Sequence, residues 1–550
     1  MKIYYRTAII LPVLLIIALA FTLSSCSAKD IEGGVTYDGN IAISCDKDAT
    51  EVVLREGTVG IASDTFADCK SLTKITIPKS VSSVQPGAFK NCTALFEGQG
   101  EIKYADNWVI YADANIENAV IKDGAVGIAY DAFSGCADIK TVSIPNSVKY
   151  IGKNVLYGAN GVTDITLPFV GSNATTNKYI GYLFGAISPG YNSKYVPKSL
   201  KTVTLTGEKT VDKECFADCV NIAEIILPDT VSLIGERAFS GCTGLKKIHI
   251  PGSVTSIGTY AFAECHSLME LNLPEGITTI PLFAFKGCIS LTEITVPESV
   301  TEIGACAIAN CANIEKINLP KNLKTIGQQA FDGCNRLKYI EIPSGEIGKG
   351  AFNECASLET VIIGKNVTKM LDNAFFSCIS LTSLTFEEES KLTSIGEEVF
   401  CYCPFTELQL PEGLTEIGDN SFYNCVGLTD IKIPNSVSKI GANVFFNCIN
   451  LIETKDLVDY VDGWIVSALP AVTYVVVDEN VRGVVDSAFA KCTHLDAVYI
   501  KDTSDGTPPT LSNIGMLNSN FESATRYYYS ETATKDGNGW HYVDGIPTVW

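Results

Sequence analysis

One hydrophobic pattern recurs every 23 residues through most of the chain. Its clearest copies place a cysteine at the same step six times in succession: Cys219, Cys242, Cys265, Cys288, Cys311 and Cys334. One copy reads L-x-x-I-x-I-P-x-x-V-x-x-I-G-x-x-A-F-x-x-C, as from Leu245 to Cys265. Because self-similarity at such a period is typical of repeat architectures, we expect one array of short units.

Each copy predicts three short elements. Ile248 and Ile250 alternate with period two, which predicts a half-buried principal strand that ends at Pro251. Val-x-x-Ile-Gly predicts a second, short strand with glycine at the corner. Ala-Phe-x-x-Cys has the spacing of a single helical or 3-10 turn that buries the Phe and Cys of each copy, such as Phe262 and Cys265.

A unit of this size cannot bury its apolar face alone, whereas stacked units cover one another. The pattern resembles the leucine-rich repeat of BspA-like (Treponema-type) bacterial surface proteins, over residues 41–500. The resemblance implies a repeat solenoid of about twenty coils, with a curved parallel β-sheet on its concave side and short helical or 3-10 turns. At ~4.8 Å per coil the array would be on the order of 95 Å long.

Three stretches depart from the pattern. Variant coils are expected at about 93–125 and 449–480, where Trp108 and Trp464 each stand 28 residues before the next register cysteine. There we expect a strand pair in place of the short turn. An insertion at about 169–200 is too long for a coil, and either carries recognition or covers a packing defect. Residues 501–550 are rich in aromatics and are expected to form a β-rich C-terminal cap.

The first 25 residues have the features of a signal peptide. A short basic region precedes an apolar stretch of about sixteen residues, which is short for a membrane-spanning helix. The stretch ends in Leu-Ser-Ser-Cys26, which resembles a bacterial lipobox; the alternative is an ordinary secretory signal with a chance cysteine. The lipobox implies a lipidated Cys26 that begins a tether over residues 26–40. We therefore expect an exported protein, lipid-anchored to the bacterial cell envelope and surface-exposed.

The composition of the chain argues against several classes of function. The formal net charge is −21, so the surface repels phosphate backbones, and nucleic-acid binding is not expected. Four scattered histidines in 550 residues, with no CxxC or HxxxH, leave little material for a metal site or a histidine-based active site. No phosphate loop, serine elbow or dinucleotide fingerprint is present. The sequence predicts no enzyme, no cofactor, no metal and no small-molecule substrate.

Cysteine is unusually frequent for an exported protein. Fifteen of the 20 cysteines occupy the repeat register. Thiols in successive coils point the same way, which is poor geometry for a disulfide, so we interpret them as small buried hydrophobes. Lipidation of Cys26 would leave an odd number, and at least one thiol unpaired.

The outward positions of the principal strands remain as candidate contacts. Neighbouring strands place them in rows, which form either a solvated salt-bridged face or a recognition surface for an extended partner. The candidate contact residues are Lys247, His249, Glu270, Asn272, Lys316, Asn318, Tyr339, Glu341, Ile362 and Tyr499.

The resemblance implies a surface protein that adheres to host matrix or plasma proteins or to other bacteria. Its expected partners are therefore extracellular proteins or bacterial surface components, with membrane contact only through the N-terminal lipid. Two alternatives stay open: a cell-envelope scaffold without a ligand, and a lipoprotein that captures glycans. Aromatic rows would favour glycan capture, but the chain contains only four tryptophans.

Overall fold

The computed structural model describes residues 29–501, 519–531, 537–543 and 546–550. The expected signal peptide and Cys26 lie outside these residues. The chain forms two compact units. The first comprises the described residues up to Val162 with Gly171–Thr176 and Tyr182–Gly185, and the second comprises Thr163–Val170, Asn177–Gly181 and Ala186–Trp550. None of the helices in the described part is long and apolar enough to cross a bilayer.

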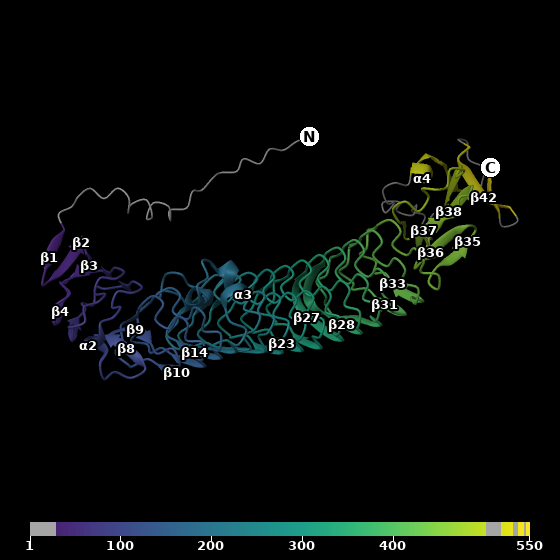
Figure 1. Cartoon of the computed structure of the whole chain (residues 1–550). Coiled ribbons are helices and arrows are strands. Elements are labelled where there is room, and N and C mark those ends of the chain that lie inside the picture. Colours follow the sequence, from purple (N-terminus) through teal and green to yellow (C-terminus); the bar gives the residue numbers. More distant parts are fainter. Residues whose placement is uncertain (1–28, 502–518, 532–536, 544–545) are drawn as a thin grey trace. The chain divides into compact units, whose positions relative to one another are not determined.

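The principal strands stack in parallel, as the Ile-x-Ile pattern predicts. In the first unit they are β4 (Glu51–Val53), β6 (Lys74–Thr76), β10 (Asn118–Val120) and β12 (Thr141–Ser143). In the second unit they are β14 (Asp164–Leu167), β15 (Thr202–Leu205), β17 (Glu224–Ile226), β19 (Lys247–His249), β21 (Glu270–Asn272), β23 (Glu293–Thr295), β25 (Lys316–Asn318), β29 (Ser383–Phe386), β31 (Glu407–Gln409), β33 (Asp430–Lys432), β38 (Tyr474–Val477) and β40 (Ala497–Ile500). Figure 1 shows β23, β31 and β33 along one edge of the ribbon.

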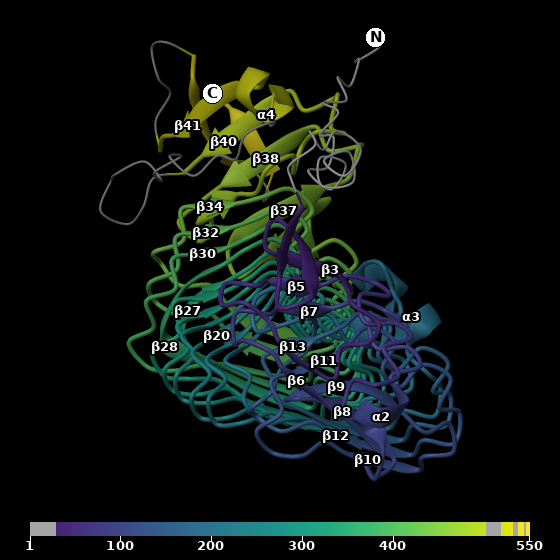
Figure 2. The ribbon, with the colours of Figure 1, turned by 60° about the vertical axis from the view of Figure 1, so that its left-hand side comes forward.

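Short strands follow at the Val-x-x-Ile-Gly positions. In the first unit they are β5 (Gly60–Ile61), β7 (Ser83–Val84), β11 (Gly127–Ile128) and β13 (Tyr150–Ile151). In the second they are β16 (Thr210–Val211), β18 (Leu233–Ile234), β20 (Ser256–Ile257), β22 (Thr279–Ile280), β24 (Glu302–Ile303), β26 (Thr325–Ile326), β30 (Ser394–Ile395), β32 (Glu416–Ile417), β34 (Lys439–Ile440) and β39 (Gly483–Val484). Figure 2 shows β30, β32 and β34 in succession.

Two coils merge both strands into one. β27 (Tyr339–Ile347) and β28 (Thr360–Met370) pair in parallel along nearly their whole length. β27 runs through Pro343, so proline does not end the principal strand there, whereas β19 ends before Pro251. The prolyl nitrogen cannot donate to the ladder, and the pairing register shifts between Ile342 and Ser344.

Glycine at the corner lets successive coils approach closely. A Cβ added to Gly258 would lie 2.4 Å from the backbone nitrogen of Glu236 in the preceding coil. That separation is far below van der Waals contact, so only glycine fits without a backbone shift. The Ile-Gly pair in the repeat therefore sets the spacing between coils.

The Ala-Phe-x-x-Cys segment forms a hydrogen-bonded turn rather than a regular helix. In the copy ending at Cys265, Ala263 N–H donates to Tyr260 O at 3.1 Å and Cys265 N–H donates to Phe262 O at 3.3 Å. Tyr260 and Glu264 have φ angles of 58° and 61°, and this left-handed pair interrupts the helical geometry. The expected single turn that buries the Phe and Cys is confirmed, with hydrogen bonds from residue i to residue i−3, but the left-handed pair prevents it from continuing as a helix.

Hairpins occupy the variant coils. The antiparallel strands are β1 (Asp30–Glu32), β2 (Val35–Asp38) and β3 (Ile41–Cys45) at the start, β8 (Ile102–Ala105) and β9 (Trp108–Ala112) next, and β35 (Glu453–Lys455), β36 (Val458–Val461) and β37 (Trp464–Ala468) later. β3, β9 and β37 each pair in parallel with the short strand of the following coil. The last strand of the hairpin takes the place of a short strand and, in β9 and β37, runs on into the position of the turn, where Ala112 N–H donates to Ala132 O and Ala468 N–H to Ala488 O.

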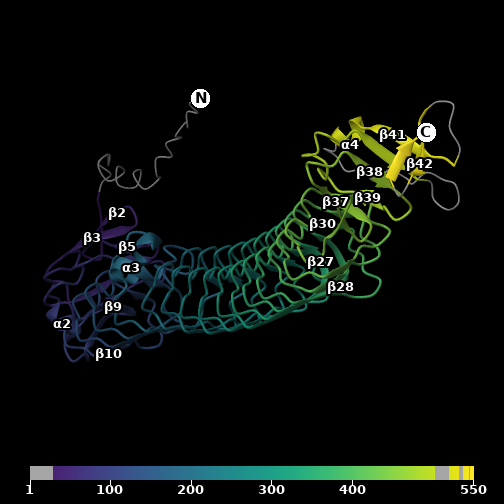
Figure 3. The ribbon, with the colours of Figure 1, turned by 90° about the vertical axis from the view of Figure 1, so that its right-hand side faces the viewer.

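The helix α2 (Thr93–Phe96) opens the variant coil that contains β8 and β9. The remaining elements belong to the insertion and the cap, and they are η1 (Ile180–Phe184), η2 (Pro189–Tyr191), α3 (Asn192–Tyr195), α4 (Ser519–Ser523), β41 (Thr525–Tyr529), β42 (Gly539–Val543) and β43 (Ile546–Val549). The cap extends the sheet in the order β38-β40-β41-β42-β43, and Figure 3 shows α4, β41 and β42 near β38. Phe521 stacks on Phe489 of the last coil at 5.0 Å and is fully buried, so the predicted cap is present.

Candidate binding surface

The side chains that flank each central residue of the principal strands point to solvent. β19, β21, β23 and β25 share one pattern, with a buried central residue between two exposed ones. In β19 the central Ile248 is 5% exposed. The period-two alternation therefore divides every principal strand into a core side and an outer side. We call the outer side of the principal strands from β17 to β33, including the principal-strand parts of β27 and β28, the strand face.

Most of the sequence-predicted contact residues lie on the strand face. Those exposed on it are Lys247, His249, Glu270, Asn272, Lys316, Asn318, Tyr339 and Glu341. Ile362 also lies on it, between Glu341 and Thr385 in register, but is half-buried. Tyr499 is half-buried in β40, beyond the strand face.

Strand pairing aligns these residues in two rows. Glu270, Glu293 and Lys316 follow one another in one row, and Asn272, Thr295 and Asn318 in the second. Neighbouring strands are ~4.8 Å apart, so each row presents a polar side chain at nearly every coil. An extended partner crossing the coils would meet both rows at once.

The charges on the strand face are largely unpaired. Among the described residues, no ion pair involves Lys247, Glu270, Glu293 or Lys316. The ion pair that does form on this face joins Lys432 to Asp430, at 2.9 Å within one strand. Of our two interpretations, a face neutralised by its own salt bridges is therefore the weaker one between β19 and β25.

Tyr499 belongs to an aromatic cluster that the sequence did not reveal. Its ring lies 5.8 Å from Tyr474, 5.4 Å from Tyr527 and 5.3 Å from Trp540, measured between ring centroids. Parallel pairing places Tyr527 of β41 directly beside Tyr499 of β40, whereas Tyr474 of β38 lies diagonally to Tyr499, whose register partner is Val476. The cluster forms only when the cap adds its strands beside the last coil, so no spacing in the repeat predicts it.

A cavity of about 590 Å³ lies next to this cluster. It is lined by the β35–β36 turn, the end of β38 and the cap strands β42 and β43, and Tyr460, Tyr474 and Tyr542 form aromatic parts of its wall. Burial, followed by the charges of Asp478 and Asp456, raises the pKa of Tyr460 to about 12. The same causes, in the same order, raise the pKa of Tyr542.

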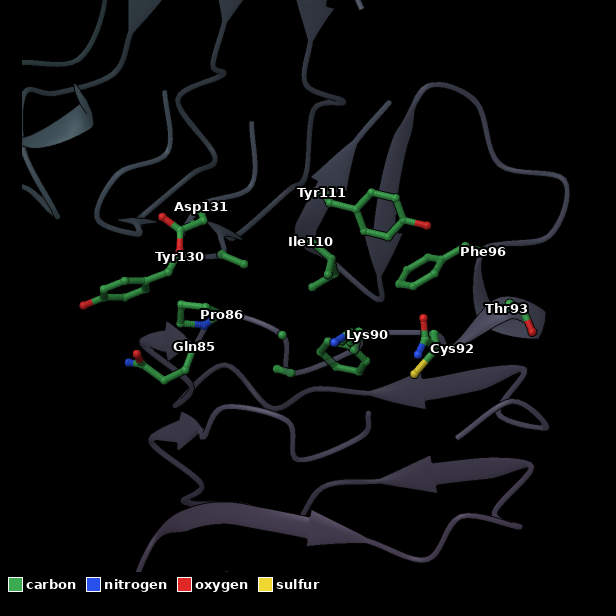
Figure 4. Close-up of a pocket in the computed structure, with 15 residues that line it drawn as sticks. Gln85, Pro86, Lys90, Cys92, Thr93, Phe96, Ile110, Tyr111, Tyr130 and Asp131 are labelled. Atoms are coloured by element: carbon green, nitrogen blue, oxygen red, sulfur yellow. The ribbon is translucent and has the colours of Figure 1, made fainter. Parts of the chain in front are cut away.

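A second cavity, of about 420 Å³, lies in the first unit (Figure 4). The hairpin β8–β9 places Tyr111 there, edge-on to Phe96 with ring centroids 5.1 Å apart. Tyr130 and Asp131 lie on the opposite side of the cavity. The cavity arises because the hairpin coil supplies Ile110 and Tyr111 where other coils supply a Phe-bearing turn.

The register thiols are buried and weakly reactive. The 19 cysteines of the described part are free, and all but Cys306 are buried. The Cys265 thiol donates to the Phe239 carbonyl of the preceding coil at 3.2 Å, and the Cys242 thiol to Phe216 at 3.0 Å. Burial raises the pKa of Cys242 to about 12. A thiol of that pKa is a poor nucleophile and a poor metal ligand at neutral pH.

The polar chemistry of the described residues points to no metal site. Within the ranges that the structure describes, no three His, Cys, Asp or Glu side chains come close enough together to hold a metal ion. His266 contacts Glu264 at 2.9 Å on the surface, and His541 stacks on Trp550 in the cap. His249 stands alone on the strand face.

Comparison with known sequences identifies the repeat. A family model described as the BspA type leucine rich repeat region, in six copies, matches residues 9–96, 107–180, 209–338, 305–429 and 415–515. No curated protein matches the chain significantly.

Several solved structures share the repeat architecture. A leucine-rich repeat protein from Bacteroides ovatus is 24% identical, with 79% of this chain and 97% of that chain covered and a TM-score of 0.42. A leucine rich cell surface protein from Faecalibacterium prausnitzii is 23% identical, with 66% and 96% covered and a TM-score of 0.29. A leucine-rich repeat protein of T. pallidum is 27% identical, with 38% and 78% covered and a TM-score of 0.23.

Proposed function

Because the chain belongs to the BspA type leucine-rich repeat family, we propose that it is a non-catalytic cell-surface protein that binds an extracellular protein with its strand face. One observation carries the proposal: between β19 and β25 the strand face presents rows of exposed side chains whose charges have no ion-pair partner in the described chain. The partner would be a host matrix or plasma protein or a component of another bacterium's surface. Binding would then serve adhesion.

The rows suit an extended partner. A single exposed ion pair contributes only ~0.2–1 kcal/mol, so no one position can hold a partner. Repetition over successive coils adds such contacts along one direction. Lys247 and Lys316 flank Glu270 and Glu293 in the first row, which sets a charge order that a partner must complement. Specificity would come from that order more than from any single contact.

Anchoring through Cys26 forms the second part of the proposal. The Leu-Ser-Ser-Cys sequence supports lipid attachment at Cys26, and two or more acyl chains suffice for stable membrane binding. Labelling cells with an alkyne fatty acid should tag the parent protein and leave Cys26→Ala unlabelled. Equal labelling of the two proteins would contradict the lipid anchor.

Binding can be tested with soluble protein comprising residues 27–550. It should bind at least one immobilised matrix protein, plasma protein or bacterial surface preparation, with saturation, at both low and high salt. Selective binding to bacterial glycans would instead favour glycan capture. Absence of binding to every ligand would favour an envelope scaffold and contradict the adhesion proposal for those ligands.

A further inference from the structure

The cavity beside the cap combines features that the strand face lacks. Its wall brings together the β35–β36 turn, the end of β38 and the cap hairpin β42–β43, all within the second unit. Tyr460 and Tyr474 are half-buried and Tyr542 is 44% exposed. Among the described residues, none of their three hydroxyls has a hydrogen-bond partner. The cavity thus offers aromatic rings and uncommitted hydroxyl groups to a ligand.

Acidic side chains surround these rings. Glu453, Asp456 and Asp478 line the cavity, against a single basic side chain, Lys455. Asp478 accepts the Asn480 N–H at 2.9 Å, and no ion pair within the described residues engages any of the three carboxylates. Asp456 and Asp478 line the same cavity as Tyr460 and Tyr542, and after burial their charges contribute to the raised pKa of both phenols. The local field is therefore negative.

The combination of tyrosine rings and carboxylates in the cavity favours some classes of ligand over others. A ring face attracts a cation through its quadrupole, with ~0.5–2 kcal/mol per contact, and a nearby carboxylate adds to the attraction. A neutral sugar could stack on the same rings but gains nothing from a net negative field. Phosphate and acidic sugars are repelled. Rings and carboxylates together favour an ammonium or guanidinium group.

Two strand edges beside the cavity favour a peptide over a free amine. Among the described strands, β35 pairs only with β36, and β43 only with β42, so each is an edge of its sheet. Glu453 and Lys455 of β35 and Ile546 and Pro547 of β43 contribute to the cavity wall. An extended peptide could pair with an edge strand while one of its side chains enters the cavity.

We propose that this cavity binds the lysine or arginine side chain of a basic segment of an extracellular protein, held between the Tyr460, Tyr474 and Tyr542 rings and the Asp456 and Asp478 carboxylates. The inference deepens the proposed function by giving the partner a basic anchor residue at the C-terminal end of the array. It does not depend on the residues of the strand face.

The test uses soluble protein (residues 27–550) and three fluorescent peptides of sequence Gly-Gly-Xaa-Gly-Gly, in which Xaa is lysine, Nε-acetyl-lysine or glutamate. Fluorescence anisotropy should show saturable binding of the lysine peptide and at least tenfold weaker binding of the other two. The variant Asp456→Asn/Asp478→Asn should lower the affinity for the lysine peptide at least tenfold, and Tyr474→Ala at least threefold. Unchanged thermal unfolding would establish that the cap is intact in both variants.

A matched control keeps the change in charge the same. Glu275→Gln/Glu412→Gln removes two exposed carboxylates from loops outside the cavity and should change the affinity less than twofold. Equal losses in control and cavity variants, equal binding of the acetylated peptide, or saturable binding of neutral maltohexaose in place of the lysine peptide would each overturn the inference. If the lysine peptide does not bind while strand-face variants still weaken partner binding, the result contradicts only the inference about the cavity and leaves the proposed function in place.

Discussion

The register cysteine has two roles in each coil, as core filler and as hydrogen-bond donor. Its thiol reaches back to a carbonyl of the preceding coil, as Cys242 does to Phe216 and Cys288 to Phe262. Each of these carbonyls also accepts a backbone N–H within its own turn, from Cys219 for Phe216 and from Cys265 for Phe262. The thiol is therefore a second, weak donor that links the turns of successive coils.

Raised thiol pKa values predict a loss of stability at alkaline pH. The pKa of Cys242 rises from about 9 in the unfolded chain to about 12, because burial disfavours the thiolate. The folded state therefore keeps the Cys242 proton to a higher pH than the unfolded chain does. The contribution of this thiol to the free energy of unfolding is fully present below pH 9. It is lost as the pH rises from about 9 toward 12, by up to ~1.4 kcal/mol per pH unit for one thiol.

Denaturant unfolding from pH 7 to 10.5 measures that slope. Cys242→Ala should be less stable at pH 7 by ~1–3 kcal/mol, because a buried side chain is shortened and the Phe216 carbonyl loses one of its two donors. The stability of the variant should also fall less steeply above pH 9. Parallel slopes in variant and parent would contradict the assignment.

Two left-handed residues per turn were not foreseen from the sequence. They stand five and one positions before the register cysteine, as Gly350 and Glu354 do before Cys355. Asparagine, aspartate and glycine are frequent at these positions, but so are larger residues. Because of this mixture, the residue types did not indicate a left-handed backbone there. The hydrophobic pattern reports which side chains are buried and says little about the backbone between them.

Glycine at such a position should stabilise the coil. Glu354 has a φ of 54° and is exposed, and a non-glycine residue in this region costs ~1–2 kcal/mol. Glu354→Gly should therefore raise the free energy of unfolding by ~0.5–1 kcal/mol, after the entropy gained by the unfolded chain is subtracted. Glu359→Gly, at an exposed position with ordinary φ, should lower it. Destabilisation by both substitutions would contradict the backbone argument.

At the scale of elements, the turns form ladders of aromatic rings. Phe262 stacks between Phe239 and Phe285, with ring centroids 5.0 and 5.5 Å away. The sequence predicted the buried Phe correctly, because its position follows from the period. It did not predict that the last strand of a hairpin covers the short-strand position as well as the turn position, since Trp464 marks the variant without showing which pairing its strand adopts.

Within the second unit, a buried ion pair holds part of the insertion. Lys178 Nζ lies 2.6 Å from Glu208 Oε2, with side-chain exposures of 8% and 5%, and Val170 N–H also donates to Glu208. Asn192 is fully buried, accepts from Gly181 N–H and donates to the Ala217 carbonyl. These contacts support the packing interpretation for this part of the insertion.

Replacing one member of the Lys178–Glu208 pair should lower the free energy of unfolding more than replacing both members. Lys178→Met leaves the Glu208 carboxylate buried and unpaired, which we expect to cost ~3–5 kcal/mol. The double variant Lys178→Met/Glu208→Met should lose less than Lys178→Met alone. Thermal and denaturant unfolding of the four proteins of the cycle measure both values; additive losses would indicate that the two side chains do not interact.

At the scale of the whole molecule, the period determined the fold. A regular 23-residue step gave the solenoid, the two kinds of strand and the buried ladder, because a repeat has to bury the same positions in every coil. The aromatic cavity could not be predicted. Tyr460, Tyr474 and Tyr542 stand outside any common spacing and meet only because the hairpin, the last coils and the cap pack together.

The central claim is that the strand face binds a protein partner, and a pair of charge-matched variants tests it most directly. Lys247→Glu/Lys316→Glu reverses two charges in one row, whereas Lys321→Glu/Lys324→Glu makes the same change on a loop off the face. Surface plasmon resonance against the partner found in the binding screen should show at least a tenfold loss for the first variant and less than a twofold change for the second. Equal affinities for both variants and the parent would contradict the claim.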